Sequence, residues 1–189
     1  MEHKRVFQRK NHRLENFDYS QDGYYYVTIC TKERVNYFGE ISSDGHMILN
    51  DCGKIVYDQW MWLSYQYEYV FLDEFVVMPN HFHGILIINN PNVCVEAGRD
   101  QPNKRTCHDM SLQKNRKIKS LSQLIGAFKT TSSKQIRNNL GLSSFQWQRS
   151  FYDHIIRDEQ SLLKIREYIN NNPAKWHLDK YNCENQNEH

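Results

Sequence analysis

The fold is decided by one stretch of the chain, Tyr69-Val-Phe-Leu-Asp-Glu-Phe-Val-Val-Met-Pro-Asn-His-Phe-His-Gly-Ile-Leu-Ile-Ile88. It contains two runs rich in β-branched and aromatic residues, 69–78 and 81–88, on either side of the dipeptide Pro79-Asn80. Each run is long enough for one strand, and the dipeptide between them favours a turn. The stretch therefore predicts a β-hairpin.

Weaker signals on both sides of this hairpin complete an α+β pattern. Further strands are predicted at 24–31, 36–41, 46–49 and near 145–152. A helix is predicted over 52–66 after a cap at Asn50 or Asp51, and a second over about 120–139 from the capping-box pattern Ser120-Leu-Ser-Gln123. A third helix is predicted over about 158–171, opened by Asp158 or nearby and ended by Pro173. This order predicts a ferredoxin-like antiparallel sheet with helices on one face, plus a C-terminal helix.

The composition is that of a globular protein. Of the 189 residues, 39% are hydrophobic and 24% are charged, which excludes a disordered chain. The five cysteines include no Cys-x-x-Cys pair, so a disulfide scaffold and a zinc ribbon are not expected. The sequence has no apolar run near 18 residues and no apolar signal segment at its start. We therefore expect a soluble, cytoplasmic protein without membrane contact.

The net charge of +2 conceals a strong segregation of charge along the chain. Residues 1–13 hold five basic groups and one acid, and residues 110–152 hold eight basic groups and no acid. We divide the chain into a basic N-terminal arm (1–19), a catalytic domain (20–180) with a polar loop or insertion at 89–119, and a tail (181–189). Charge alone leaves two interpretations open, a surface that binds a polyanion and an ordinary solvated helix face.

The motif His81-Phe82-His83 lies at the head of the second predicted strand. Alternate side chains of a strand share one face, so both imidazoles point one way and Phe82 points into the other layer. The two imidazoles could then bind one metal ion, or they could be ordinary half-exposed histidines. Gly84 would allow another backbone or a ligand to approach closely.

A second motif, Tyr168-Ile-Asn-Asn-Asn172, ends the last predicted helix. Residues four apart lie on one helix face, so this spacing offers a hydroxyl and an amide oxygen together. The alternative is structural. Tyr168 borders the apolar stripe of the same helix, and Asn172 precedes Pro173, which is typical of a helix end.

Three segments, taken in order, resemble the single-tyrosine HUH transposases, and most closely the REP-associated tyrosine transposases. They are Val76-Val-Met-Pro-Asn-His-Phe-His-Gly-Ile-Leu86, Trp147-Gln-Arg-Ser-Phe-Tyr-Asp-His-Ile-Ile-Arg157 and Tyr168-Ile-Asn-Asn-Asn-Pro173. The resemblance covers roughly residues 20–180.

The resemblance implies a role for each motif residue. His81 and His83 would be ligands of a divalent cation, Mg²⁺ or Mn²⁺, with Asn172 as the third ligand. Mobile relatives commonly carry Gln at the position of Asn172. Tyr168 would be the nucleophile. The implied activity is cleavage and rejoining of single-stranded DNA beside a palindromic hairpin, through a covalent 5′-phosphotyrosine.

The implied partner is therefore single-stranded or hairpin DNA, bound by basic side chains. The candidates for phosphate contact are Arg5, Arg9, Lys10, Lys117, Lys129, Lys134 and Arg149. The family includes single-chain forms and dimers in which the tyrosine helix serves the partner's histidines, so a homodimer stays open. Two other functions stay open: a catalytically inactive protein that binds DNA hairpins, and a phosphodiesterase acting on RNA or nucleotides. The latter would need a second histidine motif, for which only His154 is available.

Overall fold

The structure is a computed structural model that describes residues 17–89 and 118–182. Its centre is a four-stranded antiparallel sheet in the order β4-β5-β1-β6. The strands are β1 (Gly23–Cys30), β4 (Val70–Val77), β5 (His81–Ile88) and β6 (Tyr152–Ile156). The predicted hairpin is confirmed as β4 and β5. The strand expected near 145–152 begins later, because Trp147 forms only an isolated bridge with Thr31 before β6 starts.

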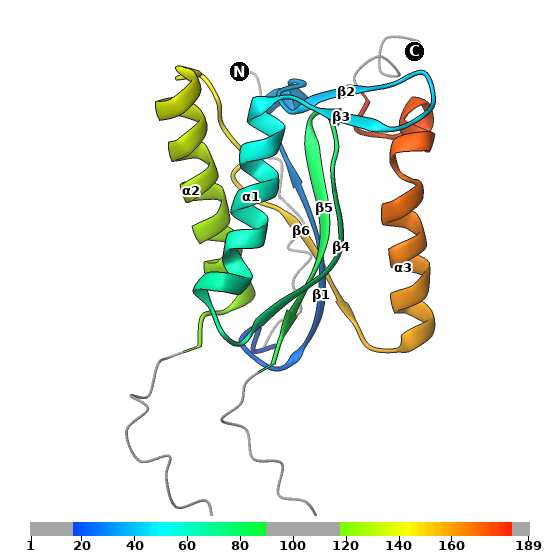
Figure 1. The fold of residues 1–189 in the computed structure, drawn as a ribbon. Helices are drawn as coiled ribbons and strands as arrows, with labels where there is room; N and C mark the ends of the chain where they lie inside the picture. The colour runs from blue at the N-terminus through cyan, green and yellow to red at the C-terminus, as the bar shows by residue number, and fades with distance from the viewer. Residues whose placement is uncertain (1–16, 90–117, 183–189) are drawn as a thin grey trace, which may run out of the picture.

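Helices cover both faces of this sheet (Figure 1). Helices α1 (Asp51–Gln66) and α2 (Leu121–Leu140) pack together on one face, and α3 (Glu159–Asn171) lies on the other. The predicted caps are present at all three N-termini, as Asn50, the Ser120–Gln123 capping box and Asp158. The predicted α+β sheet, with its C-terminal helix set apart, is confirmed.

Four smaller elements lie outside the main sheet. Strands β2 (Gly39–Ile41) and β3 (Met47–Leu49) form a separate antiparallel pair. The 3₁₀ turn η1 (Lys32–Arg34) follows β1, and the 3₁₀ turn η2 (Pro173–Leu178) follows α3. No helix in the described ranges is long and apolar enough to cross a membrane.

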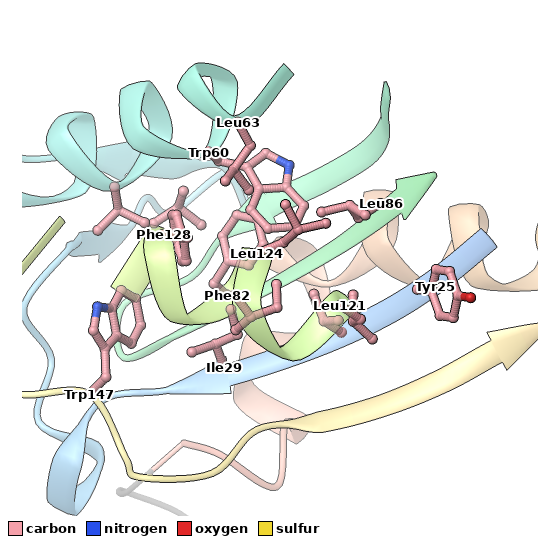
Figure 2. Packing of buried hydrophobic residues seen from close by; sticks show 14 of the residues in the cluster. Tyr25, Ile29, Trp60, Leu63, Phe82, Leu86, Leu121, Leu124, Phe128 and Trp147 are labelled. Carbon is pink, nitrogen blue, oxygen red and sulfur yellow. The ribbon is translucent and has the colours of Figure 1, made fainter. Parts of the chain in front are cut away.

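The main core lies between the sheet and the helices α1 and α2 (Figure 2). At its centre the Trp60 ring lies 4.5 Å from the Phe82 ring and 5.3 Å from the Phe128 ring, measured between centroids. All three side chains are fully buried. Burial of this size, together with the tilted and edge-on ring pairs, makes this layer the principal source of stability.

The opposite face of the sheet is covered by a much smaller apolar cluster. Tyr26, Ile85, Ile156 and Ile169 form it, and α3 is further held by a two-pronged ion pair from Arg166 to Asp73 of β4. This thin layer leaves part of the sheet face for polar side chains, and the two histidines of β5 lie there.

Gly84 is the point where the core layer presses closest on the histidine strand. A Cβ atom added there would lie 2.7 Å from Cε1 of Phe82 and 2.9 Å from Cζ2 of Trp60. The close approach at Gly84 is therefore made by aromatic side chains of the core, and the expectation that another backbone or a ligand would approach there was wrong.

We predict that Gly84→Ala lowers the free energy of unfolding by about 1–3 kcal/mol, because buried rings cannot move aside without repacking the core. Chemical denaturation measures this change. The matched control is Gly126→Ala in α2, where an added Cβ would meet no atom within 4 Å. It should stabilise the protein by about 0.5–1 kcal/mol through helix propensity. Equal effects of the two substitutions would contradict this packing.

Candidate active site

The strand β5 brings the two predicted histidines together on the α3 face of the sheet. His83 is paired with Thr28 and His81 with Cys30 across β1, and Phe82 between them points into the core. The exposed fractions of His81 and His83 are 0% and 1%. Their Nε2 atoms lie 3.0 Å apart. The expected sharing of one face is confirmed, and the rings are buried rather than half-exposed.

The proton of the His81 ring is placed by its neighbour Asn80. The Asn80 amide nitrogen donates to the backbone carbonyls of Arg34 (3.0 Å) and Tyr181 (2.9 Å). The amide oxygen therefore faces Nδ1 of His81, 2.9 Å away, and can only accept a hydrogen bond. His81 must carry its proton on Nδ1, which leaves a lone pair on Nε2.

The His83 ring can carry its proton on either nitrogen. Its Nδ1 lies 2.8 Å from the Tyr26 hydroxyl and 2.9 Å from Oγ1 of Thr28. Hydroxyl groups both donate and accept, so Tyr26 can donate to Nδ1 while Nε2–H bonds to His81, or Thr28 can accept from Nδ1–H. When the His83 proton is on Nδ1, both Nε2 atoms have a free lone pair and lie 3.0 Å apart. A cation shared by the two rings requires both of these lone pairs.

Helix α3 delivers Tyr168 to this pair within the same chain. Its hydroxyl lies 3.5 Å from Nε2 of His83, and 44% of the residue is exposed to solvent. Burial and the nearby Asp179 carboxylate raise the pKa of Tyr168, while hydrogen bonds from Asn172 and Tyr26 act in the opposite direction. A phenol that is open to solvent on one side and held beside the histidines on the other can reach a substrate.

Asn172 lies one helical turn after Tyr168. It is 4% exposed and keeps right-handed helical geometry, and its side chain acts to lower the pKa of Tyr168. Its Oδ1 atom is buried and has no hydrogen-bond partner within the described part of the chain. A buried amide oxygen without a partner costs free energy, and binding a cation would compensate for it.

Asp179, which follows the 3₁₀ turn η2, was not predicted as a site residue. Its Oδ2 atom lies 3.8 Å from Nε2 of His81, and one ligand atom from each of His81, His83 and Asp179 lie within 4.8 Å of one another. Two imidazole nitrogens and a carboxylate oxygen can hold a divalent metal ion. No local signal identifies Asp179, because only the tertiary return of the chain after Pro173 brings it to the histidines.

The same C-terminal segment covers one side of the His81 ring. The Trp176 ring stacks on His81 at 5.9 Å, and the Tyr181 ring lies 4.7 Å from it. Tyr181 and Asn182 belong to the stretch that the sequence assigned to a tail. No sequence signal therefore predicted that Tyr181 and Asn182 lie at the site.

Both histidines are neutral at physiological pH. Burial and the neighbouring His83 hold the pKa of His81 well below its usual value of 6.5, and burial lowers the pKa of His83 to about 3. The positive charges of Arg34 and Lys180 add to this effect. A neutral imidazole is the form that binds metal, so the site is ready to take a cation without first losing a proton.

Three of the seven predicted DNA-contacting residues lie in the described ranges, Lys129 and Lys134 on α2 and Arg149 before β6. Lys134 and Arg149 are exposed on the described surface. Lys129 is half-buried, and its ammonium group donates to the backbone carbonyls of Gln148 and Arg149, so it also braces the segment before β6. Arg5, Arg9, Lys10 and Lys117 lie outside the described residues. Contact of these seven side chains with DNA stays a prediction.

Comparison with known proteins agrees with this architecture. The chain is 35% identical over 176 residues to an uncharacterized protein of Haemophilus influenzae, a match that covers 93% of each chain. It belongs to the same family as that protein. No protein-family model matches the chain.

Among solved structures, one of a REP-associated tyrosine transposase bound to a REP hairpin matches with a TM-score of 0.55 and 17% identity. The match covers 91% of this chain and 77% of the transposase. This chain has the REP-associated tyrosine transposase fold. The resemblance carried by the three sequence motifs is thus confirmed at the level of the fold.

The buried histidines predict a pH dependence of stability in the metal-free protein. Below pH 6.5 the unfolded chain protonates these histidines, whereas the folded chain does not. The unfolded state then binds more protons, so the free energy of unfolding falls as the pH falls, by up to about 1.4 kcal/mol per pH unit for each histidine. Urea denaturation in EDTA between pH 7 and pH 5 measures the slope.

His83→Gln should reduce this slope by about one histidine's contribution. The control is His154→Gln on β6, the same substitution at an exposed histidine outside the buried pair, and its slope should exceed that of His83→Gln. Identical slopes for both variants would mean that His83 is not held neutral by burial.

Proposed function

We propose that this protein is a metal-dependent DNA nickase and rejoining enzyme of the HUH single-tyrosine type, which acts on single-stranded DNA beside a hairpin. One observation carries the proposal: within one chain, two neutral imidazoles converge at 3.0 Å and a solvent-accessible phenol lies 3.5 Å from one of them. The hairpin-bound transposase that shares this fold supports the choice of substrate.

Tyr168 would be the nucleophile. Its oxygen would attack the phosphorus of a single-stranded phosphodiester, forming a tyrosine–phosphate ester with the 5′ end and breaking the bond to the 3′ oxygen. The phenol proton balances the step, because the released strand ends in a 3′-hydroxyl. The ester preserves the energy of the broken bond, so a second 3′-hydroxyl could attack it and rejoin the strands without ATP.

His81 and His83 would hold a divalent cation, with oxygen donors from Asp179 and Asn172. The donor set fits, since it offers two lone pairs on neutral nitrogens, a carboxylate and a buried amide oxygen that lacks a partner. The ion would supply charge neutralisation on the scissile phosphate. Nitrogen donors favour Mn²⁺ over Mg²⁺ in affinity, whereas Mg²⁺ is the more abundant ion in cells.

Neighbouring groups of the protein would shift the pKa of the Tyr168 phenol. An ordinary tyrosine has a pKa near 10, so forming its phenolate at pH 7 costs about 4 kcal/mol. Burial and Asp179 raise this cost, and the hydrogen bonds from Tyr26 and Asn172 lower it. A cation between the histidines and Asp179 would offset the carboxylate's charge, which ties activation of Tyr168 to metal binding.

The test is the formation of a covalent adduct. A labelled DNA hairpin with an unpaired flank is incubated with the protein and Mn²⁺ or Mg²⁺, and a protein–DNA product that resists denaturation is separated on a gel. The unmodified protein should form it. Tyr168→Phe should reduce it to background and leave hairpin affinity within a few-fold, because only the attacking oxygen is lost.

The matched control is Tyr152→Phe, since Tyr152 on β6 is 45% exposed and also packs against Tyr26. This variant should form the adduct normally. An adduct that persists in Tyr168→Phe would place the nucleophile elsewhere, with Tyr181 beside His81 examined first. Hairpin binding without an adduct under either ion would favour the inactive DNA-binding alternative.

A further inference from the structure

Asn80 lies at the junction of three separate parts of the chain and is completely buried. Its amide oxygen accepts from His81, and its amide nitrogen donates to the carbonyls of Arg34 and Tyr181, so every amide donor and one acceptor position is used. Its backbone carbonyl accepts from both the amide nitrogen and the hydroxyl of Thr31. Rotation of the amide by 180° would put NH₂ against Nδ1–H and oxygen against two carbonyls, so this orientation is strongly preferred.

The C-terminal segment 179–182 is fastened to the same junction. Arg34 donates from its guanidinium to the Lys180 carbonyl at 2.8 Å and lies 5.1 Å from the centre of the Tyr181 ring. The chain has left-handed backbone angles at two successive residues beside these contacts, Glu33 (φ 58°) and Arg34 (φ 55°). Such angles are costly outside glycine and persist only where surrounding contacts hold them.

Within this segment the backbone amide of Tyr181, two residues later, orients the Asp179 carboxylate. Its Oδ1 atom accepts from the Tyr181 amide at 2.7 Å, which leaves Oδ2 directed at His81. The Tyr181 carbonyl that Asn80 binds is thus part of the residue whose amide holds Asp179. The Asn80 side chain therefore contacts both the His81 ring and the segment that carries the Asp179 carboxylate.

We propose that Asn80 is a positioning residue that keeps Nε2 of His81 available to a cation and couples this to the docking of residues 179–182, which carry Asp179. The inference rests on the function proposed above and adds a link within that site. Metal binding and docking of the C-terminal segment should then depend on each other.

Two variants of the full chain separate the two roles. Asn80→Asp keeps an acceptor for Nδ1–H of His81 but replaces the donors to the Arg34 and Tyr181 carbonyls with a carboxylate oxygen. Arg34→Gln leaves Asn80 intact and removes the guanidinium that holds the segment. The control is Asn138→Asp, the same change at an exposed position of α2.

Three measurements follow. Nitrogen NMR of the imidazoles in EDTA should show His81 protonated on Nδ1 in the unmodified protein and in both variants. Hydrogen exchange at the amides of Tyr181 and Asn182 should be about tenfold or more faster in both variants. Titration with Mn²⁺, followed by calorimetry, should show binding about tenfold weaker, the range expected when a partner of a metal ligand is lost.

The direction of the Mn²⁺ result is decisive. Both variants make the site more negative by about one charge, and by simple electrostatics they should bind Mn²⁺ more tightly. Weaker binding therefore supports coupling through the segment, and tighter or unchanged binding overturns it. A His81 ring protonated on Nε2 in the unmodified protein would overturn the positioning role.

The outcome is separable from that of the proposed function. The NMR and exchange measurements need no metal, DNA or catalysis. An unmodified protein that forms no adduct but shows these effects would refute the nickase and keep the role of Asn80. Should Asn80→Asp fail to fold, Arg34→Gln alone tests whether metal binding and docking of the segment are coupled. The Arg34 side chain is only partly buried, so we expect this variant to fold.

Discussion

The register between β5 and β1 is the constraint on which the rest of the site depends. Because His83 is paired with Thr28, the hydroxyls of Thr28 and Tyr26 reach its Nδ1, and because side chains alternate, Phe82 enters the core on the other face. A slip of one residue would exchange the two faces, placing both imidazoles against the rings of Trp60 and Phe128. The large aromatic core therefore does more than stabilise the sheet, since the burial of Phe82 fixes the direction in which the histidines point.

The two faces of the sheet have different roles: one holds the main hydrophobic core, and the other holds the candidate site. The α1–α2 face holds the extensive aromatic core, whereas α3 is held by a much smaller apolar cluster and by the Arg166–Asp73 ion pair. Local stability follows the amount of buried apolar contact. The element that carries Tyr168 is therefore attached less firmly than the strand that carries the histidines, which would suit the role proposed for Tyr168 as a nucleophile that admits a DNA strand.

The elements and the histidine pair could be predicted from the sequence because their signals are local. The hairpin around Pro79-Asn80, the caps at Asn50, Ser120 and Asp158, and the shared face of His81 and His83 each depend on a few neighbouring residues. Asp179 and the segment around Tyr181 could not be predicted, since their place depends on how the chain returns after Pro173. The role of Asn80 was likewise hidden, because its partners Arg34 and Tyr181 lie far from it in sequence.

The charges around the site would favour an anionic ligand beside a bound cation. The histidines are neutral, and Asp179 contributes one negative charge that a divalent cation would exceed. Arg34 and Lys180 lie close enough to lower the pKa of His81, so they add positive potential at the same place. A site with two neutral nitrogens, one carboxylate and two nearby cations would remain positive after taking up its metal. An anion with oxygen donors would be attracted to such a site, and a DNA phosphate beside Tyr168 meets that description.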